Sequence, residues 1–571
     1  MKKIMIRTIQ NNIMNLSSCS ILHRIYAARD ITTPCELNYD LQYLLPFYQL
    51  KDIDGAVQCL IDTIINQYSV LIIGDFDVDG AASTALAVLA LKEFGLQNIA
   101  YIIPNRFDHG YGLSSKIIDI VVDKKPHLLV TVDNGISSID GVKIVRDLGI
   151  KVIITDHHLP QNNILPQANA IINPNQTDDI FPSKNLAGVG VIFYLMMSLR
   201  AGLRKINWFK EKKVIEPNMA QFLDLVMLGT IADTVQLDYN NRILVTNGLN
   251  RIRLGKCREG IKALFKVSHR DYSKASMRDI SFIIIPKLNA AGRLDDMSLS
   301  VECLLTADII HAQFIAKKLD DINNKRRLIS EEMQKNALNI INKFQTLPFG
   351  ICMFEESWHQ GIIGIVSSRL KEKFNRPVII FTTANDNEIR GSVRSIDKIH
   401  IVNVLNNISI NNPGLIIKYG GHAMAAGITI AKENYIKFIQ IFNRELQTQT
   451  LLEDLEKIIY TDGELPNNCF NIETAELLEN AGPWGSGFPE PIFVGEFSVL
   501  NIIKKKNYFQ LFLCHTYTNQ LMKAVCFNTN YIDQLTQMQN DTIILITYSL
   551  GIWNNHGKKN LQLTIYDIVN K

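Results

Sequence analysis

The sequence predicts an α/β protein: a domain built on a parallel sheet, a long helix leading to a smaller α/β domain, and a β-barrel at the C-terminal end. From residue 70 to about residue 190, short β-rich runs alternate with helical stretches, which is the pattern of βαβ units with parallel strands. Residues 307–344 carry apolar side chains at three- and four-residue steps, which predicts one long connecting helix. Beyond residue 454, five short alternating runs predict strands.

The composition is that of a multidomain globular protein. A chain of 571 residues is too long for one ordinary core. Hydrophobic residues make up 47% and charged residues 20%, and no apolar run reaches the length of about 18 residues that a membrane span needs. The start lacks an apolar leader and the nine cysteines include no CxxC pair, so we expect a cytoplasmic protein without structural zinc. The net charge of +3 is too small to indicate a partner.

The parallel sheet is expected to contain five strands. They are predicted at residues 70–75, 98–104, 127–133, 151–156 and 168–173, with helices at 81–94, 115–123 and 139–148. The first fifty residues show no periodic pattern, so we expect them to be irregular and assign them no chemistry.

Three carboxylates follow the first of these strands. Asp75, Asp77 and Asp79 stand at alternate positions before a glycine and a helical stretch. The carboxyl ends of strands in open α/β sheets are where ligands bind. Three neighbouring anions repel one another unless a cation joins them, and hard divalent cations prefer oxygen ligands. The alternative is a solvated acidic turn.

Two further strands end in groups of the same kind. Asp133 follows the third strand, and Asp156, His157 and His158 follow the fourth. A single Asp in this position commonly caps a helix, but parallel strands bring all these ends to one edge of the sheet. Asp233 closes a helix predicted at 221–228, where an acid opposes the helix dipole. Mixed carboxylate and imidazole ligands suit a pair of Mn²⁺ or Mg²⁺ ions.

Several basic groups are candidates for binding an anion. Arg106 lies in a loop at 104–112 and either faces an anion or is a surface arginine. Arg293 stands in what reads as a small-residue turn at 289–296. Nine lysines and arginines against two acids occupy residues 251–278, which fits either a phosphate-tracking surface or a solvated helix face.

The C-terminal half predicts two more domains. In the α/β unit at 350–446, a loop at 357–369 enters a helix, strands are expected at 377–382 and 389–396, and residues 420–427 read as a glycine-rich turn that either approaches a phosphate or packs tightly. Strands at 493–503, 508–514, 522–527, 542–548 and 561–568 suit a small barrel of the OB type, which commonly binds single strands. Its aromatic residues either stack on bases or fill the core: Tyr508, Phe509, Phe512 and Trp553.

These motifs resemble those of the DHH phosphoesterase superfamily. That resemblance rests on Asp75-Phe-Asp-Val-Asp-Gly80, Val130-Thr-Val-Asp-Asn134, Thr155-Asp-His-His158 and Gly229-Thr-Ile-Ala-Asp233. Further blocks are similar to the RecJ family, bacterial single-strand-specific exonucleases: Pro104-Asn-Arg-Phe107, Leu288-Asn-Ala-Ala-Gly-Arg293, Trp358-His-Gln-Gly361, Gly420-Gly-His422 and Trp484-Gly-Ser-Gly-Phe-Pro489. Val78 and Val393 stand where the family pattern has smaller residues, and Val393 would reduce the fit if backbone approaches DNA there.

The resemblance implies a domain order and a set of functional residues. The domains would be an N-terminal segment at 1–50, a DHH domain at 51–305, a connecting helix at 306–345, a DHH-associated domain at 346–455 and an OB-fold nucleic-acid-binding domain at 456–571. Two Mn²⁺ or Mg²⁺ ions would be held by Asp75, Asp77, Asp79, Asp133, His157 and Asp233. Asp133, His157 and His158 would be catalytic, with His158 facing the scissile phosphate or completing a ligand set. The 5′-terminal phosphate and nearby backbone would be held by Arg106, Arg293, Ser367 and Arg369, with His422 contacting the strand.

The implied activity is two-metal-ion hydrolysis of single-stranded DNA from its 5′ end to 5′-mononucleotides, in DNA recombination and repair. Implied partners are single-strand binding protein and repair helicases, and a monomer is expected. Two alternatives stay open: a DHH enzyme that cleaves a small nucleotide or pyrophosphate, and a non-catalytic scaffold that binds single strands.

Overall fold

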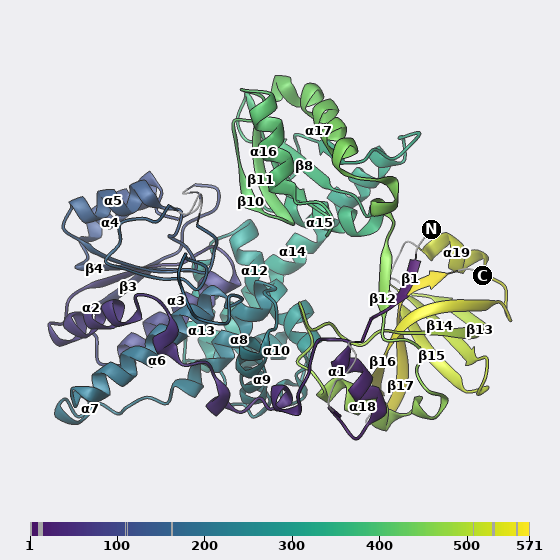
Figure 1. Cartoon of the computed structure of the whole chain (residues 1–571), viewed down its shortest axis with the longest axis horizontal. Coiled ribbons are helices and arrows are strands. Elements are labelled where there is room, and N and C mark those ends of the chain that lie inside the picture. The colour runs from purple at the N-terminus through teal and green to yellow at the C-terminus, as the bar shows by residue number, and fades with distance from the viewer. Residues whose placement is uncertain are drawn as a thin grey trace. The chain divides into compact units, whose positions relative to one another are not determined.

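The computed structural model describes residues 3–9, 15–108, 110, 112–160, 164–505, 508–527, 531–555 and 558–569 (Figure 1). The chain divides into two compact units. The sheet unit comprises Ile9–Asn323 and Glu479–Glu490, and the barrel unit comprises Met1–Thr8, Asn324–Leu478 and Pro491–Lys571. No helix among the described residues is long and apolar enough to cross a membrane.

The sheet unit is built on a five-stranded parallel sheet, as predicted. Its strands lie in the order β3-β2-β4-β5-β6. They are β2 (Val70–Ile73), β3 (Ile99–Ile102), β4 (Leu128–Val132), β5 (Lys151–Thr155) and β6 (Ala170–Ile172). Every residue of β2, β4 and β6 is buried, which explains why their sequences are apolar except for Thr131. Ile73 pairs with Thr131, and Thr131 with Ile154, so the three central strands end side by side.

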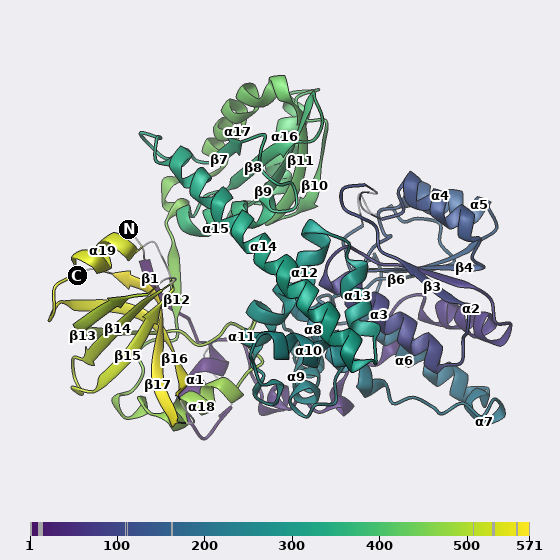
Figure 2. The same cartoon turned by 180° about the vertical axis from the view of Figure 1, so that it is seen from behind.

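Helices cover both faces of this sheet. Figure 1 and Figure 2 show α4 (Ser115–Lys124) and α5 (Ile139–Asp147) on one face, and α2 (Ile53–Ile65), α3 (Val78–Glu93) and α6 (Gly188–Lys205) on the other. The unit continues with seven further helices: α7 (Trp208–Glu211), α8 (Leu223–Ala232), α9 (Tyr239–Arg253), α10 (Glu259–Val267), α11 (Met277–Asp279), α12 (Ile285–Leu294) and α13 (Ser298–Leu305). α3 packs against both α6 and α8, which brings the ends of all three helices near the acidic loop.

The expectation of an irregular N-terminal segment is wrong. β1 (Lys3–Ile6) pairs in parallel with β12 (Ile458–Thr461) within the barrel unit, and α1 (Ser20–Ala27) forms in the sheet unit. Tyr26 and Arg29 donate hydrogen bonds to the carbonyl oxygens of Ala481 and Pro489. The segment lacks a visible pattern because contacts with residues more than 400 positions away order it.

The predicted long helix is confirmed as α14 (Ile309–Ile341), whose sequence extends across the division between the units. In the barrel unit, a five-stranded sheet has the order β10-β11-β9-β8-β7. Its strands are β7 (Ile351–Phe354), β8 (Val378–Thr383), β9 (Glu388–Arg394), β10 (Lys418–His422) and β11 (Ala425–Ala431), and its helices are α15 (Ile363–Phe374), α16 (Ile401–Asn411) and α17 (Tyr435–Gln449). Residues 420–427 are therefore a hairpin of two paired strands, with the turn only between His422 and Ala425.

The predicted OB-type barrel is confirmed. A closed barrel with the order β13-β14-β15-β17-β16 is formed by β13 (Phe493–Lys504), β14 (Phe509–His515), β15 (Leu521–Cys526), β16 (Ile543–Asn555) and β17 (Lys558–Val569). Two helices, α18 (Ile472–Asn480) and α19 (Ile532–Gln537), lie before and between these strands in the sequence. Phe509 is buried in the barrel core, whereas Phe512 and Trp553 are each 37% exposed.

Candidate metal centre

The acidic loop after β2 is buried. Asp75 is 5% exposed and Asp79 is 1% exposed, so the solvated-turn alternative is wrong. Asp77 is the N-cap of α3, and its Oδ1 accepts hydrogen bonds from the backbone N–H groups of Asp79 (3.0 Å) and Gly80 (3.1 Å). This N-cap fixes the loop so that the three carboxylates leave one strand end together.

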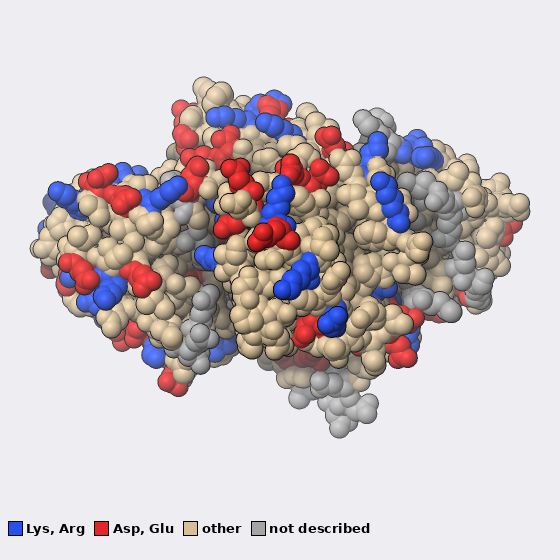
Figure 3. All heavy atoms as spheres, turned by 90° about the horizontal axis from the view of Figure 1, so that it is seen from above, with Lys and Arg blue, Asp and Glu red and all other residues tan. Residues whose placement is uncertain are grey.

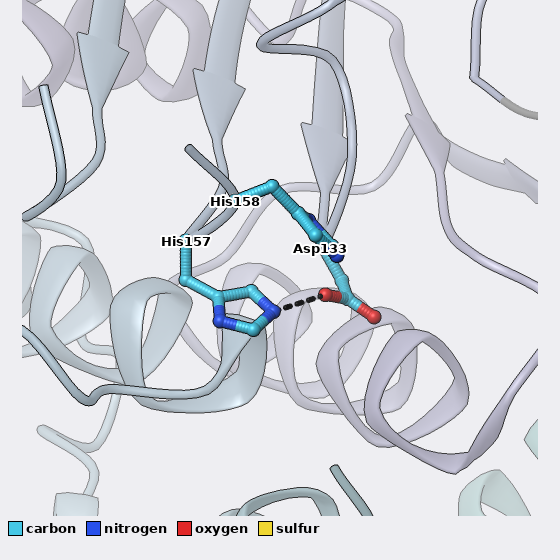
Figure 4. Close-up of side chains that lie close together, drawn as sticks. All are labelled: Asp133, His157 and His158. Atoms are coloured by element: carbon cyan, nitrogen blue, oxygen red, sulfur yellow. Dashed lines mark ion pairs between the residues drawn. The ribbon is translucent and has the colours of Figure 1, made fainter. Parts of the chain in front are cut away.

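Side chains from three other elements converge on this loop. Asp133 directly follows β4 in a left-handed conformation, with φ at 62°. His157 follows β5, and its Nε2 lies 3.2 Å from Asp133 Oδ1 (Figure 4). The same Nε2 lies 3.5 Å from Oδ2 of Asp233, the residue that ends α8. Four separate elements therefore contribute to one cluster.

The cluster offers three overlapping groups of ligand atoms, and the atoms of each group lie within 4.8 Å of one another. One group is Asp75, Asp77 and Asp133; the others are Asp79, His157 and Asp233, and Asp133, His157 and His158. All six predicted metal ligands belong to these groups. Oδ1 of Asp75 is buried and has no hydrogen-bond partner among the described residues, as expected of an oxygen atom that binds a cation.

The electrostatics of the carboxylates also favour bound cations. Burial, and next the charge of Asp77, raise the pKa of Asp75 to about 8 and that of Asp79 to about 7. Burial and the neighbouring Asp79 raise the pKa of Asp233 to about 8, and burial with nearby carboxylates raises the pKa of Asp133 well above its ordinary value. Burial and mutual repulsion thus disfavour the charged forms of these carboxylates, and divalent ions would supply the compensating charge.

Asp79 is held by the beginning of another helix. The backbone N–H groups of Gly188 and Val189 at the start of α6 donate to its two carboxylate oxygens, at 2.6 and 3.0 Å. A Cβ added at Gly229 in α8 would lie 2.4 Å from Asp79 Oδ1, so α8 approaches closely only because this residue is glycine. Sequence reasoning missed these contacts because a backbone donor carries no residue-type signal.

Asp156 has a role that the sequence did not assign. This fully buried carboxylate accepts hydrogen bonds from the backbone N–H of Ile136 (2.9 Å), from those of His157 (2.7 Å) and His158 (3.1 Å), and from Nδ1 of His158 (2.7 Å). Burial disfavours the charged forms of both Asp156 and His158. The attraction between the two groups outweighs this effect, so the pKa of Asp156 falls to about 2 and that of His158 rises to about 9. Because Nδ1 is bound by Asp156, a phosphate or metal would meet His158 at Nε2.

Arg106 lies beside the acidic loop. Its guanidinium carbon is 4.0 Å from the centre of the Phe76 ring. Burial lowers its pKa, while the charges of Asp75 and Asp77 act in the opposite direction. The structure therefore places Arg106 next to the acidic cluster and not on an isolated surface turn.

Arg293 lies on a helix, so the expected small-residue turn is wrong. Asn289 Oδ1 on α12 accepts a hydrogen bond from the backbone N–H of Val78 at 3.1 Å. A Cβ at Gly292 would come within 2.0 Å of the Phe76 carbonyl oxygen. Packing of α12 on the acidic loop thus overrides the low helix propensity of Gly292 and Pro286.

Three predicted substrate-binding residues belong to the barrel unit. Ser367 on α15 is fully buried, and its hydroxyl donates to the carbonyl of Gly364 at 3.1 Å. Arg369 on the same helix donates to Oε1 of Gln334 at 3.0 Å, and His422 at the end of β10 is exposed. Val393 is fully buried in the sheet core, so its side chain faces other apolar residues.

The comparisons with known proteins agree along the chain. Residues 69–230 match the DHH family N-terminal domain, residues 346–448 the DHHA1 domain and residues 461–567 the RecJ OB domain. The single-stranded-DNA-specific exonuclease RecJ of Haemophilus influenzae is 44% identical over 561 residues, which cover 96% of both chains. That of Escherichia coli is 44% identical over 555 residues, covering 96% of this chain and 95% of the relative.

A solved structure shares the fold. The crystal structure of RecJ in complex with Mn²⁺ from Thermus thermophilus matches with a TM-score of 0.81 and 23% identity, over 100% of this chain and 80% of that one. The domain order, the acidic cluster and the near-complete overlap with relatives at 44% identity lead to one assignment: the chain belongs to the RecJ family of the DHH superfamily.

Proposed function

We propose that this chain is a single-stranded-DNA-specific exonuclease that hydrolyses DNA from its 5′ end and releases 5′-mononucleotides, in DNA recombination and repair. The observation that carries this proposal is the complete cluster of five aspartates and His157 at one sheet edge, in a chain 44% identical to the Haemophilus influenzae exonuclease. The closed barrel supports the choice of a polymeric substrate, because OB folds commonly bind single strands.

The cluster is assigned to two Mn²⁺ or Mg²⁺ ions. When bound, such ions supply hydroxide from water near neutral pH and stabilise charge on the phosphate. Asp75, Asp77 and Asp133 form one side of the ligand set; Asp79, His157 and Asp233 form the other. Asp156 holds His158 as a hydrogen-bond donor, which suits contact with the scissile phosphate.

The remaining site residues are assigned to the DNA strand. Arg106 lies beside the acidic loop and Arg293 on the helix packed against it, and both are assigned to the 5′-terminal phosphate region. Among residues of the barrel unit, Ser367 and Arg369 are assigned to the 5′-terminal phosphate and the neighbouring backbone, and His422 is assigned to contact with the strand. We keep the domain division at residues 51–305, 306–345, 346–455 and 456–571 as part of this proposal, with a monomeric cytoplasmic enzyme that works with single-strand binding protein and helicases.

A metal-dependent cleavage assay tests the proposal. One oligonucleotide, labelled separately at each end, is incubated in single- and double-stranded form with Mn²⁺, with Mg²⁺ or with EDTA. Immediate release of a 5′-labelled mononucleotide, with gradual shortening of the 3′-labelled strand, is expected only for the single strand and only with metal. Binding without cleavage would favour a scaffold, and neither activity would favour a small nucleotide substrate.

Asp133→Ala separates chemistry from binding. Asp133 belongs to two of the three ligand groups, so we expect its loss to abolish hydrolysis while DNA binding is largely kept. Asp147→Ala is the matched control, because Asp147 lies exposed on α5 and outside the cluster. Loss of binding together with cleavage in a folded Asp133→Ala variant would refute this division of roles.

A further inference from the structure

Phe282 is the most exposed phenylalanine among the described residues, with 77% of its surface accessible; Phe314 follows with 66%. No aromatic ring or cation contacts the Phe282 ring within the part of the chain that the structure describes. Single exposed apolar residues are common on proteins, so exposure by itself indicates nothing. The position of Phe282 on the helix that reaches the metal centre is what distinguishes it.

Phe282 lies in a π-helical turn, Ile280–Ile284, which leads directly into α12. In a regular α-helix the N–H of residue 286 would bond to the Phe282 carbonyl, but residue 286 is proline and has no N–H. Instead the N–H of Ile285 bonds to the carbonyl of Ile280, five residues earlier. Such turns occur frequently at functional sites.

The same helical face carries Phe282 at one end and Arg293 at the other. Steps of four, three and four residues from Phe282 lead to Pro286, Asn289 and Arg293, which are all partly exposed. The opposite face is buried, comprising Ile284, Ile285, Leu288 and Ala291. Also on the buried side, Lys287 forms an ion pair with Asp320 of α14. The exposed face is therefore a rigid track about 16 Å long at the helical rise of 1.5 Å per residue.

This track ends at the metal centre. Asn289 and Gly292 contact the acidic loop directly, through Val78 and the Phe76 carbonyl. Arg278, one turn before Phe282, is 45% exposed and pairs with Glu490, so the outer end of the track carries both charges. On the face drawn in Figure 3, Lys and Arg are interspersed with Asp and Glu. An unpartnered aromatic ring at this end is a surface on which a base of a single strand can stack.

We propose that Phe282 stacks on a base of the single strand and positions it along the exposed face of α12, a few nucleotides from the metal centre. The proposal rests on the proposed exonuclease function and names a substrate-positioning residue for it. Every base has a π-face, so one aromatic ring can hold strands of any sequence.

Abasic scanning tests the proposal in the full-length protein. Binding of 5′-phosphorylated oligonucleotides with one abasic site at successive positions is measured in EDTA, for the unchanged protein, Phe282→Ala and Phe282→Trp. We expect Phe282→Ala to bind the intact strand roughly tenfold more weakly and Phe282→Trp to restore binding. One abasic position should weaken the unchanged protein by a similar factor and leave Phe282→Ala unaffected. Phe314→Ala, which removes another exposed ring, is the matched control.

Steady-state cleavage provides a second readout. Phe282→Ala should raise KM for long strands and leave kcat, as well as cleavage of dinucleotides too short to reach the ring, unchanged. Equal binding by Phe282→Ala and the unchanged protein, or an abasic profile without a Phe282-dependent position, overturns the proposal while cleavage itself persists. Absence of single-strand cleavage by the unchanged protein would instead refute the exonuclease function.

Discussion

Replacing Asp156 by Asn tests whether a buried carboxylate orients His158. In Asp156→Asn the side-chain volume is nearly unchanged, but one oxygen becomes an NH₂ group. Oδ2 accepts from Ile136 N–H, and Oδ1 accepts three N–H bonds, two of them from His158. The amide therefore sets its NH₂ group against an N–H donor in either orientation.

The cost follows from these bonds. The better orientation leaves the Ile136 N–H without an acceptor, which costs about 1–3 kcal/mol, and weakens three bonds that a charge had strengthened. We expect the free energy of unfolding of the sheet unit to fall by about 2–4 kcal/mol. Because partners of a metal-site histidine typically affect activity 10- to 100-fold, kcat should fall by about that factor.

Exonuclease assays at saturating Mn²⁺ give kcat and KM, and calorimetric Mn²⁺ titration measures the metal affinity. We expect kcat to fall while KM for the single strand changes little, since the residue contacts His158 and not the strand. Asp147→Asn makes the same chemical change at an exposed position of α5, so this variant should behave as the unchanged protein. A folded Asp156→Asn variant with unchanged kcat would refute the orienting role.

Three further predictions concern packing, protonation and the N-terminal segment. Gly229→Ala places a Cβ 2.4 Å from Asp79 Oδ1. We expect overpacking to lower the free energy of unfolding by about 1–3 kcal/mol, measured by thermal unfolding, and Mn²⁺ to bind more weakly, measured by calorimetry. An unchanged metal affinity would contradict this. The pKa values of Asp75, Asp79 and Asp233 are about 7 to 8 in the folded protein, against about 4 in the unfolded chain. The protonated carboxyl groups therefore contribute fully to the free energy of unfolding below about pH 4, and this contribution is lost as the pH rises through the folded-state values. The metal-free protein should therefore lose stability as pH rises to about 8, and added Mn²⁺ should reverse the loss; a melting temperature that rises over this range without metal would exclude it. Arg242→Ala removes a guanidinium that donates to the Glu36 carbonyl at 3.4 Å and lies 5.8 Å from the centre of the Tyr39 ring, so limited proteolysis should cut residues 30–50 faster. Unchanged cleavage rates would show that other contacts order the segment.

The local pattern of apolar residues in the sequence was sufficient to predict the main elements of the fold. The parallel strands β2, β4 and β5 were predictable because strands buried on both faces have almost continuous apolar sequences, and the barrel strands because their burial alternates. The meeting of Asp75, Asp133 and His157 was predictable for the same reason, since parallel strands in register end at one edge. The turn predicted at residues 289–296 was wrong because residues 289–294 belong to α12, where tertiary packing outweighs the low helix propensity of Gly292.

The sequence by itself determined which groups gather at the sheet edge, because strand direction and register follow from short-range periodicity. Only the tertiary structure decided how those groups are held. Asp79 receives its hydrogen bonds from Gly188 and Val189, more than 100 residues away, and Asp156 holds His158 through an acceptor geometry that residue types do not reveal. The orientation of a side chain depends on backbone donors and close packing between distant segments, and these contacts exist only after the helices have packed on the sheet.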